Sequence, residues 1–136
     1  MTATVAVALR ARHAVVRRGV GGLFLFTAGV HVGLVGADPQ VYAGFADAAL
    51  VPGVRSLWDD VFLARPALWG LAVAALELTI ALLLLLGRGR WLRLGWAAVI
   101  GFHLALMTFG WGFWLWSVPF LALVLPAAVV DLREAS

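Results

Sequence analysis

Cysteine is absent from this 136-residue chain, and so is lysine. Without a thiol the chain forms no disulfide, no cysteine metal site and no CxxC redox pair, so quinone reductases of the CxxC type are excluded. Charged residues make up only 12% of the sequence, whereas a soluble domain carries about 25%. That is too few for a nucleic-acid footprint, despite the net charge of +3. We expect no nucleic acid as a partner and take the arginines as a signal of membrane orientation.

Apolar residues are abundant instead, at 64% of the chain, and the mean hydropathy is +1.02. A soluble domain of this length could not hide so much apolar surface from water. Four stretches are long enough to cross a bilayer, which takes about 20 apolar residues per helix. They cover residues 18–37, 66–86, 91–110 and 112–130. The sequence therefore predicts an all-α integral membrane four-helix bundle, a single domain over 1–136, with the lipid bilayer as its surroundings.

The arginines are distributed unevenly between the two sides of this predicted bundle. Since cytoplasmic loops of membrane proteins are enriched in arginine and lysine, we expect both termini and the 87–90 turn in the cytoplasm. Residues 38–65 then lie outside, in a multi-pass protein of the plasma (inner) membrane. The larger set is Arg10, Arg12, Arg17, Arg18, Arg88, Arg90, Arg93 and Arg133, and the smaller set is Arg55 and Arg65.

Segment 38–65, between the first two spans, is too apolar and too regular for a slack loop. Asp38 followed by Pro39 predicts an N-cap and a first-turn proline, opening a short helix that Pro52 and Gly53 end. A second amphipathic stretch follows, and we expect it to lie in the interface or to cap the bundle. The apolar positions are Val41, Phe45 and Ala49 in the first helix and Val54, Leu57, Trp58, Val61 and Phe62 in the second.

Three ionisable side chains fall well within the predicted spans: His31, Glu77 and His103. At 1.5 Å per helical residue, both histidines lie about 10 Å below the outer boundary, and Glu77 lies about 16 Å deep. The three side chains can therefore form one polar cluster between the first three helices. We expect the two imidazoles to face each other across the bundle.

The neighbours of these residues on each helix indicate that they face protein. Glu77 shares its face with small residues, which lets neighbouring helices approach. Thr27 lies one turn before His31, and Met107 lies one turn after His103, so both are candidate ligand-binding residues. The GxxxG pattern of Gly29 and Gly33 also favours close packing. We expect the aromatic run 109–116 to wall an outward-facing pocket at the level of the histidines.

Several interpretations of this cluster stay open. Polar side chains can simply hold membrane helices together. They can also hydrogen-bond a quinone or a lipid, or form a proton or ion path, because intramembrane ionisable groups commonly mark function. His31 and His103 are candidate cofactor-binding residues, since a b-type haem needs two such nitrogen ligands on opposite sides of the iron. A metal site is not expected, because the depth of Glu77 differs from that of the histidines.

The sequence resembles the DoxX-like family of small four-helix membrane proteins. Its first helix reads Arg18-Gly-Val-Gly-Gly-Leu-Phe-Leu-Phe-Thr-Ala-Gly-Val-His31, followed by the loop Asp38-Pro-Gln-Val-Tyr-Ala-Gly-Phe45. The second helix, Glu77-Leu-Thr-Ile-Ala-Leu-Leu-Leu-Leu-Leu-Gly87, and the basic turn after it are similar to the family's glutamate, leucine run and terminal glycine. His31 and Glu77 occupy the matching positions.

The resemblance implies a small integral subunit or accessory protein of a quinone-linked membrane redox assembly. Such a protein binds quinone, haem or lipid between its first three helices, and its partners are other membrane subunits or further copies of itself. The alternatives are a small transporter or channel component, and a structural or assembly partner of a larger membrane complex.

Overall fold

The computed structural model describes residues 3–134, and within that range it contains helices and no strands. The long helices are α1 (Ala3–Ala37), α3 (Pro66–Leu86), α4 (Arg90–Leu106) and α5 (Trp111–Glu134). The short ones are the 3-10 helix η1 (Pro39–Tyr42), α2 (Pro52–Leu57), the π-helix η2 (Trp58–Phe62) and the 3-10 helix η3 (Met107–Phe109).

Four helical stretches are long and apolar enough to cross a membrane, namely Ala11–Ala37, Pro66–Leu86, Arg90–Phe109 and Trp111–Arg133. With 21 residues, α3 has a length of about 31 Å, which matches the hydrocarbon core of a bilayer. The predicted all-α membrane bundle is therefore confirmed, and the protein is a multi-pass membrane protein.

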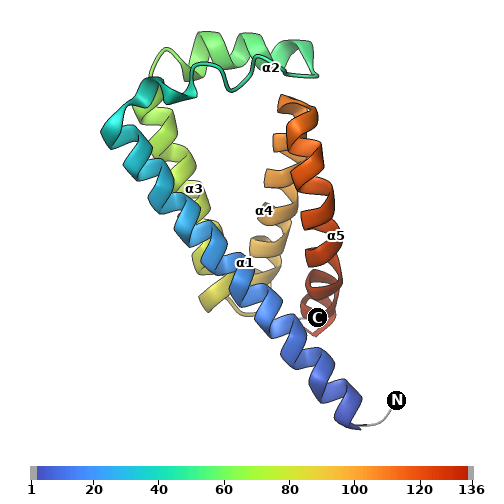
Figure 1. The fold of residues 1–136 in the computed structure, drawn as a ribbon. Coiled ribbons are helices and arrows are strands. Elements are labelled where there is room, and N and C mark those ends of the chain that lie inside the picture. Colours follow the sequence, from blue (N-terminus) through green and yellow to red (C-terminus); the bar gives the residue numbers. More distant parts are fainter. Residues whose placement is uncertain (1–2, 135–136) are drawn as a thin grey trace.

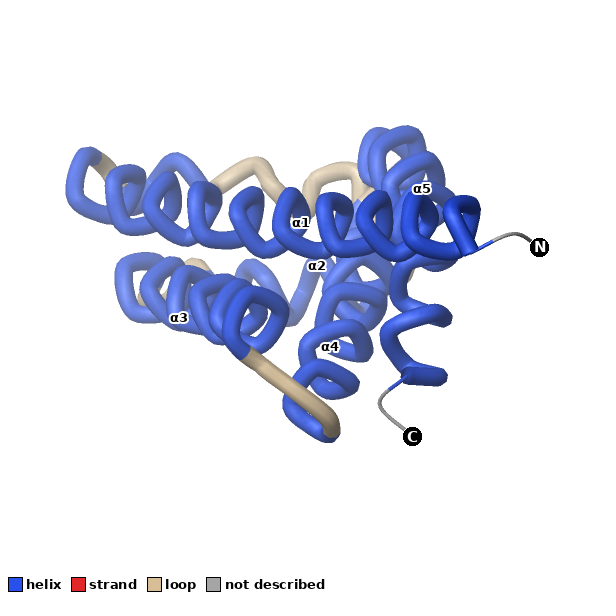
Figure 2. Tube along the Cα trace, turned by 90° about the horizontal axis from the view of Figure 1, so that it is seen from below, coloured by secondary structure: helices blue, strands red, loops and turns tan. Residues whose placement is uncertain are grey.

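The four long helices form two pairs that diverge toward one end of the molecule. The most extensive contact joins α1 to α3, and α4 contacts both α3 and α5. In Figure 1, α4 runs beside α5. Figure 1 shows the pairs close together at the lower end and apart at the upper end, where η1, α2 and η2 bridge the gap. Figure 2 shows the same two groups from below. We call residues 38–65 the cap.

The pairs meet in a packed apolar core. Trp96 is fully buried there, and its indole Nε1 donates a hydrogen bond of 3.0 Å to Oδ2 of Asp131. The same carboxylate lies 3.7 Å from the Arg17 guanidinium, so the Asp131 side chain links α5 to both α1 and α4. The other core side chains are Val20, Phe24, Ile80, Ala81, Leu84, Leu92, Val99, Val124, Ala127 and Ala128.

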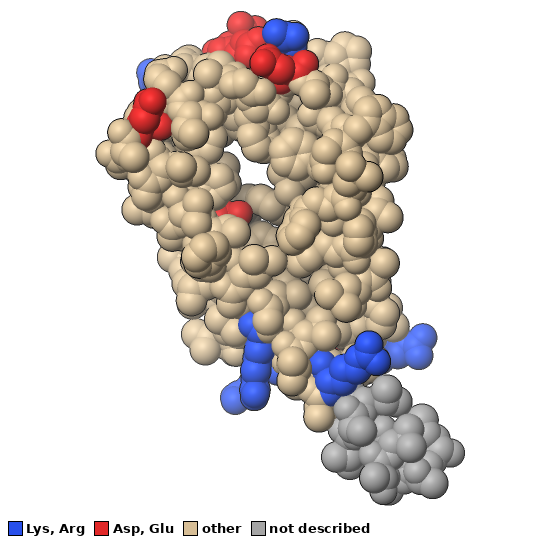
Figure 3. Space-filling model, viewed as in Figure 1, with Lys and Arg blue, Asp and Glu red and all other residues tan. Residues whose placement is uncertain are grey.

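The charges lie at opposite ends of the bundle. Figure 3 shows arginines gathered at the lower end, which we call the arginine end, and acidic residues gathered over the cap. The arginine end includes Arg17, Arg18 and Arg88. The described arginines of the larger set thus gather at the end opposite the cap, whereas the side chain of Arg10 lies outside the described residues.

The cap differs from the two helices expected over 38–65. Asp38 does cap the first turn, accepting the Gln40 N–H at 2.9 Å, but η1 ends at Tyr42. After it, successive i to i+3 bonds form turns from Tyr42 to Ala49, so Val41, Phe45 and Ala49 share no helical face. Pro52 begins α2 rather than ending a helix, because its missing N–H has no cost in a first turn.

Two other expectations about α1 are wrong. The helix begins at Ala3 rather than at residue 18, because the preceding sequence contains neither proline nor glycine to interrupt it. Within the described part of this chain, the GxxxG pair Gly29 and Gly33 makes no close helix contact, since a Cβ added at either would meet no atom within 4 Å. Close approach occurs at Gly21 instead, where an added Cβ would lie 2.7 Å from the Leu85 side chain.

Candidate functional site

A cavity of about 460 Å³ lies between the two helix pairs, directly under the cap. Figure 3 shows the opening beneath the cap, with acidic atoms visible inside it, and Glu77 is the acidic residue of the lining. The opening lies between transmembrane helices, so it faces the space that lipid occupies. A ligand in this cavity can therefore enter from the bilayer.

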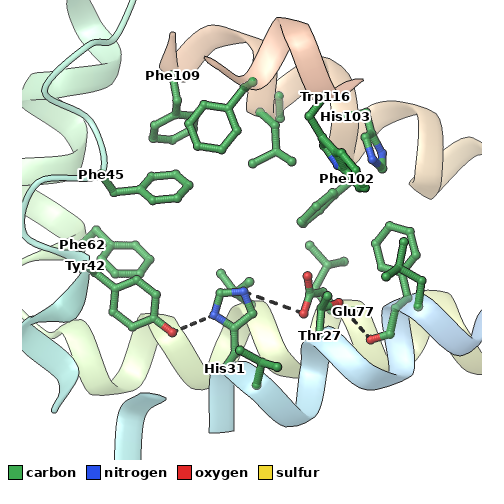
Figure 4. A pocket seen from close by; sticks show the side chains of 18 of the residues that line it. Thr27, His31, Tyr42, Phe45, Phe62, Glu77, Phe102, His103, Phe109 and Trp116 are labelled. Atoms are coloured by element: carbon green, nitrogen blue, oxygen red, sulfur yellow. Dashed lines mark hydrogen bonds and ion pairs between the residues drawn. The ribbon is translucent and has the colours of Figure 1, made fainter. Parts of the chain in front are cut away.

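One wall of the cavity carries a row of three polar side chains. The His31 Nδ1 lies 2.6 Å from the hydroxyl of Tyr42, and its Nε2 lies 3.8 Å from Oε2 of Glu77. The imidazole and phenol rings stack, with their centroids 5.7 Å apart. Figure 4 shows the three side chains in sequence, from the cap toward the middle of the membrane. Three elements supply them: η1, α1 and α3.

In this short contact the phenol is the donor, because a phenol O–H is a stronger acid than the N–H of a neutral imidazole. Burial raises the pKa of Tyr42 above its ordinary value of 10.0, and the charge of Glu77 acts in the same direction. Tyr42 is thus protonated at neutral pH and donates its O–H to Nδ1. A neutral His31 then carries its proton on Nε2, which points toward Glu77.

Within this row, Glu77 has a carboxyl oxygen that lacks a hydrogen-bond partner among the described residues. The side chain is buried, and this oxygen is Oε2. The contact of 3.8 Å with His31 is too long for a direct hydrogen bond. The Thr27 hydroxyl lies against the same carboxyl but donates to the Phe24 carbonyl at 3.2 Å. A hydrogen-bond donor on a ligand could bind the carboxylate form of Glu77. A ligand carbonyl could instead accept a hydrogen bond from the protonated carboxyl.

His103 lies on the opposite side of the cavity, among aromatic rings. It stacks on Phe120 at a centroid distance of 4.2 Å and contacts Phe24 and Phe102 edge-on. Its Nδ1 donates to the Val99 carbonyl at 3.0 Å, which leaves Nε2 as an acceptor. Both histidines line the same cavity, but within residues 3–134 no hydrogen bond or ion pair joins His103 to His31 or Glu77.

The other two candidate residues are placed differently. Thr27 lines the cavity beside Glu77, one turn from His31. Met107 is not among the lining residues. It lies in η3, where its carbonyl accepts a hydrogen bond of 2.8 Å from the Trp114 indole.

The side of the cavity under the cap is lined by aromatic rings. The sequence did not predict that Phe45, Trp58 and Phe62 of the cap belong to the site. Trp58 stacks on Phe62 at 3.7 Å and on Phe45 at 4.9 Å, and it meets Phe109 edge-on. Its indole donates to the Tyr42 carbonyl at 3.0 Å, which holds η1 and η2 together. The expected wall from the 109–116 run is present, since it lines the cavity through Phe109, Phe113 and Trp116.

A backbone hydrogen bond also joins the cap to the α4–α5 pair. The Leu50 N–H donates to the Thr108 carbonyl at 3.0 Å. Beside it, Gly110 has φ +140, and a Cβ there would lie 2.8 Å from the Ala48 carbonyl oxygen. Only glycine suits both the conformation and the close approach. The cap therefore closes the cavity against the aqueous side while leaving its lateral face open.

Within the described residues, no group of three or more His, Cys, Asp or Glu side chains is placed to hold a metal ion. Comparison with known proteins found no matching family model, curated protein or solved structure.

Proposed function

We propose that this protein binds the head group of a quinone, taken from the surrounding bilayer, as a small subunit or accessory protein of a membrane redox assembly. The observation that carries the proposal is the row Tyr42–His31–Glu77 on the wall of an otherwise apolar cavity that opens to the membrane.

The cavity suits such a ligand in size and chemistry. Small-molecule sites span about 300–1,000 Å³ and combine apolar walls with a few placed polar groups, and this cavity has about 460 Å³. A planar ring can lie against aromatic side chains such as Phe45 and Phe102. Its carbonyl oxygen can accept a proton or a hydrogen bond from the His31–Glu77 pair, while its isoprenoid tail remains among the lipid chains.

The polar row can also exchange protons with the ligand. Reduction of a quinone to a quinol takes up two protons and two electrons, and this proposal assigns the electrons to a partner subunit. Glu77 and His31 are within reach of the cavity, and Tyr42 continues the row toward the cap. Protons thus have a path between the ligand and the cap side of the membrane.

Haem fits the site less well than quinone. A bis-histidine haem needs one free ring nitrogen from each side. The Nδ1 of His31 contacts the Tyr42 hydroxyl and its Nε2 faces the Glu77 carboxyl at 3.8 Å, and the His103 ring is stacked on Phe120. Two such ligands would require the row and the stack to be dismantled.

The alternative of a transporter or channel receives less support. Below the cavity, fully buried side chains such as Ile80, Trp96 and Val99 form a packed layer. This layer separates the polar row from the arginine end. The row therefore communicates with the membrane and the cap rather than with both sides of the bilayer.

We also propose that the chain belongs to the DoxX-like family, which its sequence resembles. We also assign the arginine end to the cytoplasm of the plasma (inner) membrane, following the enrichment of arginine in cytoplasmic loops. Other subunits, or further copies of the chain, would supply the electron path.

The test is a titration of the purified full chain in detergent with a short-chain ubiquinone analogue, followed by tryptophan fluorescence. Trp58 and Trp116 line the cavity and report its occupation. His31→Ala and Glu77→Leu should weaken binding by about ten-fold or more, as expected for a lost hydrogen bond to a charged group. Glu77→Gln should be milder, because the amide keeps part of the hydrogen-bonding capacity.

The matched control is Thr79→Val, on the same helix but exposed and bonded to its own backbone. It should bind like wild type. Equal affinity in all variants, or no saturable binding, would contradict a quinone site. Loss of stability without any ligand would instead favour a structural role for the row, and a Soret band in the absorption spectrum of the purified protein would favour haem.

A further inference from the structure

A second recess lies at the arginine end, far from the quinone cavity, and the proposed function does not use it. It has a volume of about 490 Å³ and lies between α1, the turn from α3 to α4, and α5. Three arginines line it, Arg17, Arg18 and Arg88, against a single acidic residue, Asp131. The recess is therefore positively charged.

The cations of this recess are incompletely paired. Asp131 already accepts the Trp96 indole at 3.0 Å, and the Arg17 guanidinium stands 3.7 Å away. The Nε of Arg17 is buried and has no hydrogen-bond partner among the described residues. A guanidinium carries five N–H donors, so Arg17 retains most of its capacity for an anion.

Arg18 and Arg88 are exposed at the rim. Among the side chains of residues 11–133, no hydrogen bond or ion pair engages either guanidinium. Planar guanidinium groups bind phosphate oxygens in pairs. The rim thus presents two further donors to the same space.

The turn itself adds positive potential. Gly89, with φ +52, precedes α4 and has no side chain to cap it, although the Trp91 N–H donates to the Arg88 carbonyl at 3.2 Å. The positive end of a helix dipole attracts anions. Gly89 lines the recess together with Arg88, so this helix start lies beside the arginine cluster.

We infer that this recess binds the phosphate group of an anionic phospholipid from the adjoining leaflet. The border carries lipid-exposed Leu85 and Leu86, along which an acyl chain can continue from the head group. Basic pockets between transmembrane helices bind anionic head groups in this manner. A soluble phosphate shares the chemistry but gains nothing from the apolar border.

The experiment measures the thermal stability of the full chain in detergent as phosphatidylglycerol, phosphatidylcholine or inorganic phosphate is added. Phosphatidylglycerol should stabilise the wild type saturably and phosphatidylcholine should not. An Arg18→Gln, Arg88→Gln double variant should need roughly thirty-fold more phosphatidylglycerol, about five-fold for each arginine. Both side chains are exposed, so the fold does not depend on them.

The matched control is Arg133→Gln, which removes an equal charge at the same end but outside the recess. It should respond to phosphatidylglycerol much as wild type does. If it weakens the response as strongly as one recess substitution does, the attraction is diffuse and the site is wrong. Equal stabilisation by the two lipids would also overturn the inference. Stabilisation by inorganic phosphate alone, lost in the double variant, would support the phosphate site and assign its ligand to solution.

Discussion

Tyr42 is the one tyrosine of the chain, and it connects the cap to the buried row. Its hydroxyl contacts His31, its ring meets Phe62 edge-on at 5.3 Å, and its carbonyl accepts the Trp58 indole. A single side chain thus transmits any movement of η2 to the imidazole. Because no other phenol is present, its ionisation can be followed without ambiguity.

The phenol of Tyr42 should ionise above its ordinary pKa of 10.0, because burial and the charge of Glu77 both disfavour the phenolate. The stabilisation linked to this shift is complete below the unfolded-state pKa and is lost as the pH rises through the folded-state pKa. Near-ultraviolet titration of phenolate absorbance measures the shift, with denatured protein as reference.

Glu77→Gln should lower this pKa, since it removes the negative charge while burial persists. An unshifted titration in the native protein would mean that Tyr42 is solvated and that the cap does not seal the row.

At the residue scale, the sequence identified His31, Glu77 and Thr27 because polar groups are rare in apolar spans. Tyr42 could not be found in the same way, since its approach to His31 depends on how the cap folds back. One signal was present: it is the lone tyrosine in the segment that follows the first span. Met107 was selected by helical spacing, which η3 interrupts.

Among the helices, α3 provides the space in which the Tyr42 ring packs beside His31. A Cβ added at Gly70 would lie 2.6 Å from Val35 Cγ2 and 3.0 Å from Tyr42 Cε2. The glycine therefore leaves room for the phenol ring against α3. The same helix turns Glu77 inward, while Leu71, Leu78 and Leu82 remain exposed.

Gly70→Ala should destabilise the protein by about 1–3 kcal/mol, as overpacking of a filled site does. It should also return the Tyr42 titration toward the ordinary value, because the ring must move outward. Thermal unfolding and the phenolate titration measure the two effects.

Gly22→Ala provides the matched control, since no atom lies within 4 Å of its added Cβ. This helix-interior substitution should be neutral or stabilising by up to about 1 kcal/mol. If Gly70→Ala behaves in the same way, Tyr42 does not occupy the position beside α3.

Hydropathy was sufficient to predict the long helices. The bilayer thickness sets their length, and their backbone N–H and C=O groups must form hydrogen bonds within the helix because lipid offers none. The cap has no such constraint, and its turns, π-helix and aromatic contacts arise from tertiary packing. The inward face of α3 followed from small residues, whereas the GxxxG of α1 did not pack. Glycine spacing alone does not say which face a neighbour covers.

At the scale of the whole molecule, charge separates the two ends. The cap carries Asp59 and Asp60, and the opposite end carries the arginine cluster. Such asymmetry orients a protein during insertion, because arginine-rich loops stay on the cytoplasmic side.

Single cysteines at Ala48 and Ser56 should react with a membrane-impermeant thiol reagent in intact cells, whereas a cysteine at Arg90 should react only after lysis. All three positions are exposed, and the absence of native cysteine leaves no background. Mass spectrometry of the purified variants measures the labelling. Reaction at position 90 in intact cells, with protection of positions 48 and 56, would invert the orientation.

The divergence of the two helix pairs gives the protein a tapered outline. It takes up more area in the leaflet beside the cap than in the other, so the lipids of the two leaflets meet perimeters of different length. A tapered body is accommodated better by a curved bilayer than by a flat one. We therefore expect lateral pressure in the broader leaflet to favour a closer approach of the two pairs, which would narrow the space beneath the cap.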